Sequence, residues 1–228
     1  MSRISKAPDE RRSELIDCAE RLFYSKGYES TSVSDIVNEV GVAKGTFYYY
    51  FDSKLAILEA MIDDLIAQLE AIMRDIIDDE TLSALQKWTL TFQVTNNWKI
   101  DRKGEMLEVL RALQSDENVI LQYKMIQRMR EIAAPEIAKI VRQGVAEGVF
   151  ETPSHPQDAA TIALAIGQHF SSSIADALLN QDNYEDPVVY VKRNLEATQT
   201  AIERILGAAE GSMPLIDEQT ITIWFADQ

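Results

Sequence analysis

Two short amphipathic segments that meet at Gly41 constrain the fold of this chain more than any other feature. Apolar residues recur at helical spacing over 33–40, and a second short segment covers 44–51. Gly41 can take the left-handed conformation that ends a helix, and Val42 is an apolar residue suited to the corner that follows. Because two short helices joined by such a turn form a helix-turn-helix, the spacing predicts that motif here.

Flanking residues indicate where these helices begin and which helix supports them. Ser32 is a suitable N-cap, and Asp35 can reach back to complete a capping box. Residues 9–26 repeat apolar side chains every three or four positions, and Gly27 ends that pattern. We therefore expect a first helix over 9–26 that packs against the helix-turn-helix.

The helix predicted over 44–51 divides into a buried face and an exposed face. Phe47 and Phe51 lie four positions apart, so they share one face and should be buried. The opposite face then holds Lys44, Gly45, Thr46, Tyr48 and Tyr49. Tyrosine, threonine and lysine side chains bind phosphate oxygens and base edges, and a glycine allows close approach to DNA. This face is therefore the candidate DNA-contacting surface.

The formal net charge of −15 is unusual for a DNA-binding protein, but it is unevenly distributed. Residues 1–55 contain eight basic and nine acidic side chains, so nearly all of the negative charge lies in the remainder of the chain. Since only the contacting face of a DNA-binding protein must be basic, the overall charge does not exclude binding.

Four segments near the N-terminus resemble the signature of the tetracycline-repressor (TetR) family of transcriptional regulators. They are residues 23–28, 31–36, 41–51 and 53–54, and the resemblance extends over about residues 9–58. The resemblance implies an N-terminal domain of three helices that binds operator DNA, followed by a helical body that senses a ligand and dimerises. It also implies that Thr46, Tyr48 and Tyr49 face the DNA and that Lys44 and Gly45 lie at the groove.

The resemblance also implies two phosphate contacts outside the recognition helix. Lys54 would contact one backbone phosphate, and Ser32, with the helix N-terminus that it caps, would meet another. The sequence departs from the family at Ala43, where many members have a serine that caps the recognition helix.

Beyond residue 53 the apolar pattern stays helical. Glycine (9) and proline (6) are scarce, which favours helices throughout. The predicted helices cover 53–78, 81–100, 103–114, 117–147, 157–180 and 187–206. The stretch 220–225 alternates and is compatible with a short strand, a helical turn or an arm. We thus expect an all-α protein with a DNA-binding domain over 1–54 and a ligand-sensing and dimerisation domain over 55–228.

In the TetR family the last two long helices form a four-helix dimer interface, here the helices at about 157–180 and 187–206. Apolar and small residues line one face of each predicted helix. They are Ala159, Ile162, Ala163, Ile166, Phe170, Ile174 and Leu178 on the first, and Val188, Val191, Leu195, Thr198, Ile202 and Ile205 on the second. A homodimer also suits the function, because two recognition helices related by a dyad bind a palindrome.

The same resemblance places a ligand pocket among the helices of the body. Its candidate residues are Trp88, Phe92, Trp98, Met106, Leu110, Tyr123, Gln127, His169 and Phe170. Their composition favours an aromatic or lipophilic effector. Ordinary core packing gives the same spacing, so it remains the alternative for each residue.

The sequence contains none of the usual signs of catalysis. It has no glycine-rich phosphate loop, no nucleophile elbow and no histidine-rich metal spacing. Its single cysteine, Cys18, lies on the apolar face of the first predicted helix. We therefore expect no enzyme activity, no cofactor and no metal. The longest uncharged stretch, 159–175, is too short and too polar for a membrane span, so the sequence favours a cytoplasmic protein.

Together these features predict a transcriptional repressor that binds a palindromic operator as a homodimer and is released by a small apolar or aromatic ligand. Two alternatives stay open. One is a DNA-binding regulator without a small-molecule effector, and the other is a helical ligand carrier with a non-functional head.

Overall fold

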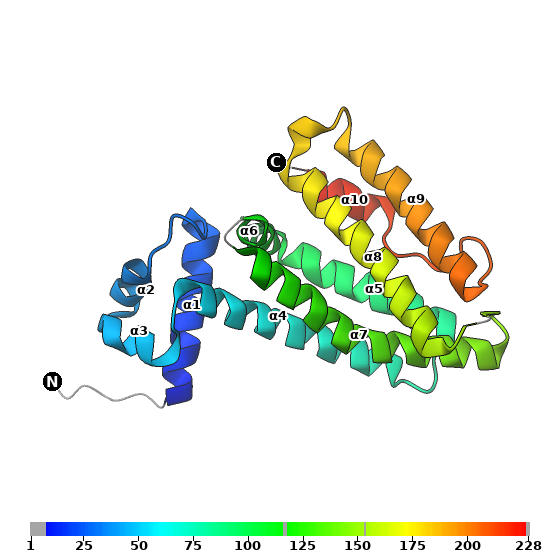
Figure 1. The fold of residues 1–228 in the computed structure, drawn as a ribbon, viewed down its shortest axis with the longest axis horizontal. Coiled ribbons are helices and arrows are strands. Elements are labelled where there is room, and N and C mark those ends of the chain that lie inside the picture. Colours follow the sequence, from blue (N-terminus) through cyan, green and yellow to red (C-terminus); the bar gives the residue numbers. More distant parts are fainter. Residues whose placement is uncertain (1–7, 116–117, 153, 227–228) are drawn as a thin grey trace. The chain divides into compact units, whose positions relative to one another are not determined.

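The computed structural model describes residues 8–115, 118–152 and 154–226, and the regular elements within them are all helices. They are α1 (Pro8–Lys26), α2 (Val33–Val40), α3 (Lys44–Tyr50), α4 (Lys54–Ile77), α5 (Ala84–Asp101), α6 (Lys103–Gln114), α7 (Val119–Glu147), α8 (Pro156–Leu179), the 3₁₀ turn η2 (Gln181–Asn183), α9 (Pro187–Leu206) and α10 (Glu218–Phe225). Figure 1 shows their order along the chain. The nine helices predicted from the sequence are present, and the predicted all-α class is confirmed.

The chain forms two compact units. Of the described residues, the first unit contains 8–67 and 104–123, whereas the second contains 68–103 and 124–226. The division falls inside α4 and α7, and α6 belongs to the first unit although it follows α5 in sequence.

The first unit is built on a small core in which α1 packs against α2 and α2 packs against α3. Leu15 and Phe23 of α1 are buried together with Ile36 of α2 and Phe47 of α3. Cys18 is also buried, as its place on the apolar face predicted, and its thiol lies 3.7 Å from the carbonyl oxygen of Ile36. These contacts hold the three short helices in one arrangement, which none of them could keep alone.

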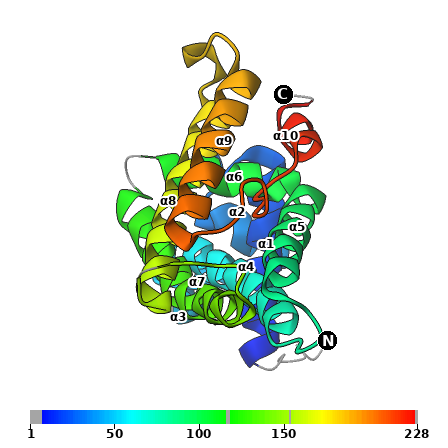
Figure 2. The same cartoon turned by 90° about the vertical axis from the view of Figure 1, so that its right-hand side faces the viewer.

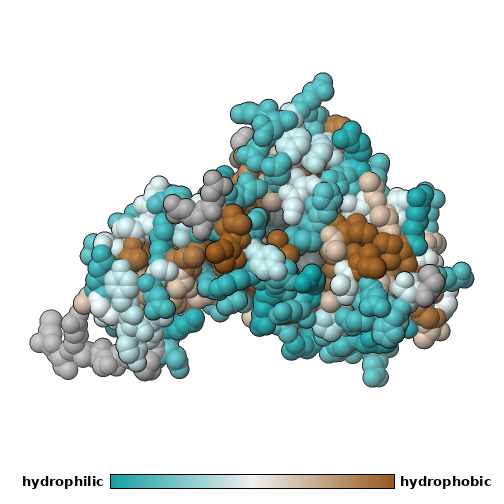
Figure 3. Space-filling model, in the orientation of Figure 1, coloured by the Kyte–Doolittle hydropathy of each residue, from teal (hydrophilic) through white to brown (hydrophobic). Residues whose placement is uncertain are grey.

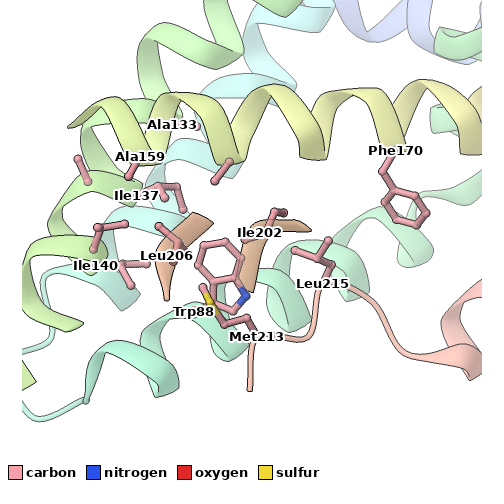
Figure 4. Close-up of a cluster of buried hydrophobic side chains, with 14 of the residues drawn as sticks. Trp88, Ala133, Ile137, Ile140, Ala159, Phe170, Ile202, Leu206, Met213 and Leu215 are labelled. Carbon is pink, nitrogen blue, oxygen red and sulfur yellow. The ribbon is translucent and has the colours of Figure 1, made fainter. Parts of the chain in front are cut away.

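The second unit has the larger core, to which α5, α7, α8, α9 and the C-terminal segment contribute. Figure 4 shows Trp88 of α5 among Ile202 and Leu206 of α9 and Met213 of the C-terminal segment. Helices α8 and α9 pack side by side along their length (Figures 1 and 2).

The stretch 218–225 forms helix α10, so of the alternatives that the sequence left open for 220–225 the short strand is wrong. Gly207 ends α9 with a φ of 65°, and the chain then leads to α10, which packs against α5 and α9 (Figure 2). Asn96 Nδ2 donates a hydrogen bond to the carbonyl of Leu215 at 2.7 Å, and Lys103 Nζ donates to the carbonyl of Ile223 at 2.9 Å. These long-range contacts hold residues 207–226 against α5.

The apolar faces expected at a dimer interface lie mostly inside the second unit. Ala163 and Phe170 of α8 and Val191 and Ile202 of α9 are buried in the core. These helices need their apolar faces to close the core of their own subunit, so the expected stripes are not free for a partner. The exception is Ile162, which lies on the outward face of α8 together with Ala165, His169 and Ser172.

Helix α8 is apolar enough, by length and composition alone, to pass for a membrane span. Its most apolar window has a mean hydropathy of 1.2, and 28% of that window is buried. A single helix of this kind is weak evidence for a membrane protein, because core helices of soluble proteins pass the same test. The apolar patch over α8 is visible as a brown area in Figure 3.

Candidate nucleic-acid interface

The N-terminus of α2 is fixed by the capping box that the sequence predicted. The backbone N–H of Asp35 donates to Ser32 Oγ at 3.2 Å, and the backbone N–H of Ser32 donates to Asp35 Oδ2 at 2.7 Å. The Ser32 hydroxyl donates to the same carboxylate at 2.7 Å. Lys26 of α1 adds an ion pair to Asp35 at 2.9 Å. The hydrogen bonds from Ser32, followed by the one from Lys26, hold the pKa of Asp35 well below its usual range.

The turn between α2 and α3 follows from its glycine. Gly41 has a φ of 74°, and its N–H donates to the carbonyls of Asn38 and Val37. The N–H of Val42 donates to the carbonyl of Val37 at 2.9 Å, which closes the last turn of α2. At the start of α3, Ala43 provides no side-chain cap. The departure from the family pattern therefore leaves the N-terminus of α3 without a side-chain hydrogen bond.

Helix α3 is anchored by two phenylalanines, as predicted. Phe47 and Phe51 are buried, with their ring centroids 5.7 Å apart. Arg12 of α1 lies over the Phe51 ring at 5.3 Å from its centroid. No local pattern in the sequence connects α1 to the end of α3, so this contact was not predicted.

The opposite side of α3 faces outward. Tyr48 is 49% exposed and Tyr49 is 77% exposed, while Lys44 and Gly45 are exposed and Thr46 is half-buried. A Cβ atom at Gly45 would meet nothing within 4 Å, so the backbone there is open to an approaching molecule. Two large aromatic side chains held in water on a seven-residue helix are unusual for a plain solvated surface.

Lys54 is bound within the first unit. Its Nζ donates to the carbonyl of Tyr28 at 2.9 Å, lies 4.0 Å from the centroid of the Tyr28 ring and is 4.0 Å from the Glu29 carboxylate. These contacts tie the start of α4 to the link between α1 and α2. The sequence contained no signal for them, because Lys54 and Tyr28 are far apart in the chain.

The predicted ligand-binding residues are divided between the two units. Met106, Leu110 and Tyr123 belong to the first unit, where Tyr123 is 64% exposed. In the second unit, Trp88 and Phe170 are buried, and Phe92 lies 4.8 Å from Trp88 between ring centroids.

The remaining candidates of the second unit lie nearer its surface. Trp98 is half-buried and stacks with Arg102 at 4.4 Å, and Gln127 is half-buried beside Arg130. His169 is exposed on the outward face of α8 and does not lie in the core.

Comparison with known proteins agrees with the geometry of the first unit. Residues 15–61 match the family model described as "Bacterial regulatory proteins, tetR family". Over these residues the chain belongs to the TetR family. The match covers α2, α3 and the turn between them, so this segment is a helix-turn-helix of the kind found in that family.

Two curated relatives show where the similarity lies. An uncharacterised HTH-type transcriptional regulator of Lactococcus lactis is 45% identical over 53 residues, which is 23% of this chain and 27% of that protein. The HTH-type transcriptional repressor KstR2 of Mycolicibacterium smegmatis is 26% identical over 143 residues, which is 63% of this chain and 69% of that protein. The chain thus spans about a quarter of the first relative and about two thirds of the second, which is a repressor.

Solved structures match the fold over most of the chain. A TetR-family regulator from Pectobacterium atrosepticum has a TM-score of 0.62 at 17% identity, covering 87% of this chain and 95% of that one. A complex of SmeT with triclosan has a TM-score of 0.60 at 16% identity, covering 91% and 98%. FadR of Thermus thermophilus in complex with lauroyl-CoA has a TM-score of 0.56 at 18% identity, covering 82% and 92%. At such low identity these matches establish the fold alone.

Proposed function

We propose that this TetR-family regulator binds operator DNA through the outward face of α3. The main support is the arrangement of that helix. Phe47 and Phe51 are buried and anchor it to the core of the first unit, while Tyr48 and Tyr49 remain exposed to solvent. Lys44, Gly45 and Thr46 complete the surface at the N-terminal end, where the helix dipole attracts phosphate. Residues 1–54 would then be the DNA-binding domain, as the sequence predicted.

Lys54 and Ser32 contribute to this function in a different way from the residues of α3. Both are engaged in contacts within the first unit, with Tyr28 and Asp35 respectively. A phosphate could be bound at Lys54 only in addition to the Tyr28 carbonyl, and at Ser32 through the backbone N–H groups of α2. We expect these positions to support binding to any DNA sequence, whereas α3 discriminates between bases.

The regulator is proposed to act as a homodimer through α8 and α9, because one short recognition helix contacts too few base pairs for useful specificity. The surface that supports this is the outward face of α8, where Ile162 is 47% exposed. Ile162→Glu should shift the protein towards a monomer in light scattering. Val145→Glu, an equally exposed apolar position on α7, should leave the oligomeric state unchanged.

Release from the operator is proposed to follow binding of a small apolar or aromatic ligand in the body. Triclosan and lauroyl-CoA in the complexes of SmeT and FadR support an effector of this class. The ligand must prefer the conformation that does not fit DNA, and a thousandfold loss of operator affinity requires about 4 kcal/mol of coupling. Repression in the cytoplasm is the expected mode, since repressors occur among the relatives.

The experiment that tests the DNA-binding proposal is selection of bound duplexes from a random pool by the purified full chain at moderate salt. We expect a palindrome whose half-sites lie about one helical turn apart, or roughly 34–36 Å. Thr46→Ala should then weaken binding to the selected duplex by about 1–3 kcal/mol. Ser30→Ala, at an exposed position of the α1–α2 link, is the matched control and should leave affinity unchanged.

Recovery of no enriched sequence would contradict the proposal and favour a ligand carrier with a non-functional head. Enrichment of a palindrome that no small molecule releases would favour a regulator without an effector.

A further inference from the structure

Helix α5 carries a stripe of aromatic and polar side chains along one face. Trp88, Phe92, Thr95 and Lys99 follow one another at intervals of four, three and four residues, which places them on one side of a helix. At Trp88 and Phe92 this side packs in the core of the second unit, and Asn96 of the same helix binds the C-terminal segment.

Two polar groups at one end of this stripe have no hydrogen-bond partner among the described residues. They are the indole Nε1 of Trp88 and the hydroxyl of Thr91, and both atoms are inaccessible to solvent. Thr95, one turn further on, has the hydrogen bond that is usual for a buried threonine, because its hydroxyl donates to the carbonyl of Thr91 at 2.7 Å. Buried polar groups are nearly always paired, so the unpaired ones at Trp88 and Thr91 require an explanation.

The other end of the stripe has an unpaired positive charge. The ammonium of Lys99 has no ion-pair or hydrogen-bond partner among the described residues, although the side chain is half-buried. Burial of this ammonium lowers its pKa, which is the direction expected when no carboxylate compensates the loss of water. Lys139, by contrast, is bound to Asp78 and Glu136, and these partners raise its pKa.

The two ends are separated by a length that suits an extended molecule. Lys99 lies eleven positions after Trp88 on the helix, which corresponds to about 16 Å along the axis. Between them lie the ring of Phe92 and the methyl group of Thr95, so the middle of the stripe is apolar. Met213 and Leu215 of the C-terminal segment are buried against the same core.

We propose that this face of α5 binds an elongated apolar molecule with one anionic head group, with the head at Lys99 and the chain running towards Trp88 and Thr91. The anion would compensate the unpaired ammonium, and an acceptor at the far end of the ligand would pair with the Trp88 N–H or the Thr91 hydroxyl. A lysine ammonium is a compact charge and lacks the planar pair of donors that an arginine guanidinium presents. It therefore selects for a negative charge and not for one particular kind of acidic group. Residues 207–217 would have to shift to admit the ligand.

This inference names the effector class for the proposed function, but its test does not depend on DNA. Binding of decanoate and of decanol to the full chain is measured by calorimetry and by tryptophan fluorescence, in the absence of DNA. Decanoate should bind about tenfold or more tightly than the neutral decanol, because the anion pairs with a partly desolvated charge.

Variants at Lys99 separate the head-group contact from general apolar binding. Lys99→Met should remove the preference for decanoate and leave decanol binding unchanged, whereas Lys99→Arg should keep the preference. Lys124→Met, which removes an exposed positive charge on α7, is the control and should behave like the unaltered protein. Equal binding of the two probes, no binding of either, or a preference that survives in Lys99→Met would overturn the proposal.

Failure of this proposal is distinguishable from failure of the proposed function. A protein that selects a palindrome but ignores decanoate would still be a DNA-binding regulator with another effector or none. A protein that binds decanoate through Lys99 but selects no DNA sequence would keep the ligand site and lose the proposed function.

Discussion

The two units of this protein satisfy their polar groups in different ways. In the first unit, Thr31 is buried and its hydroxyl donates to the carbonyls of Gly27 and Leu22, while Ser32 and Asp35 bind each other. In the second unit, Trp88 and Thr91 bury polar atoms without a partner among the described residues. The first unit thus pairs these buried polar groups locally, whereas the second leaves two of them unpaired, and the ligand site proposed above rests on those two groups.

The largest effect is expected where the first unit depends on a single anchor. Phe47→Ala removes a fully buried ring from beneath α3 and should lower the stability of the first unit by about 3–5 kcal/mol. The measurement is urea unfolding, followed by binding to the selected duplex, which should be lost. Tyr48→Ala, on the exposed face of the same helix, should change stability by less than about 0.5 kcal/mol. Similar losses in both variants would mean that α3 is not anchored as described.

A second prediction concerns Gly207, where the end of α9 lies close to the backbone of Glu151. A Cβ atom there would lie 2.5 Å from the carbonyl oxygen of Glu151, and the φ of +65° already disfavours other residues. Gly207→Ala should therefore destabilise the second unit by about 1–3 kcal/mol in thermal unfolding. The matched control is Gly211→Ala, where φ is +74° but nothing lies within 4 Å.

Gly211→Ala should show only the smaller cost of the left-handed backbone, about 1 kcal/mol. Equal losses at the two glycines would mean that the approach to Glu151 is not close. The result would also weaken the view that distant contacts hold the second unit together.

The sequence predicted the first unit better than the second, and the reason lies in where the signals for each feature stand in the chain. Local signals lie within a few residues of what they determine: Ser32 and Asp35 predicted the start of α2, Gly41 its end, and the spacing of Phe47 and Phe51 the buried side of α3. The helices of the body were likewise predicted from their periodicity, to within a few residues.

Contacts between distant residues left no such signal. Nothing near Lys54 indicates that it binds the carbonyl of Tyr28, and nothing in 220–225 indicates that it folds as a helix on α5 and α9. The stripes on α8 and α9 were recognised as apolar, but periodicity cannot say whether an apolar face packs inside the subunit or against a partner. The position of His169 on the outside of α8 was unpredictable for the same reason.

A third prediction tests whether the negative charge of Asp35 in the capping box of α2 stabilises the first unit. Ser32→Ala should cost about 1 kcal/mol at neutral pH. Because the pKa of Asp35 is lowered in the folded protein, its carboxylate contributes stability above its ordinary pKa of 3.8, and that contribution is lost as the pH falls below this value. The stability difference between the unaltered protein and Asp35→Asn should therefore narrow as the pH drops below about 4.

Denaturant unfolding of both proteins across that pH range is the measurement. Asp52→Asn, at an exposed position before α4, is the control for loss of a carboxylate. A difference that stays constant from neutral to acidic pH would show that the box acts through neutral hydrogen bonds and not through the carboxylate charge.

The smallest effect, and the sharpest test of the contrast between the units, is expected at two threonines one turn apart on α5. Thr91→Val replaces an unpaired buried hydroxyl with a methyl group of the same shape, so stability should stay the same or rise by up to about 1 kcal/mol. Thr95→Val removes a hydroxyl that donates to the Thr91 carbonyl at 2.7 Å, so stability should fall by about 0.5–1.5 kcal/mol. Thermal and urea unfolding of both variants decide the sign. A loss of stability in Thr91→Val as large as that in Thr95→Val would mean that the Thr91 hydroxyl already has a hydrogen-bond partner in the free protein. The second unit would then have no unpaired hydroxyl at this position, and the contrast with the first unit would be weaker.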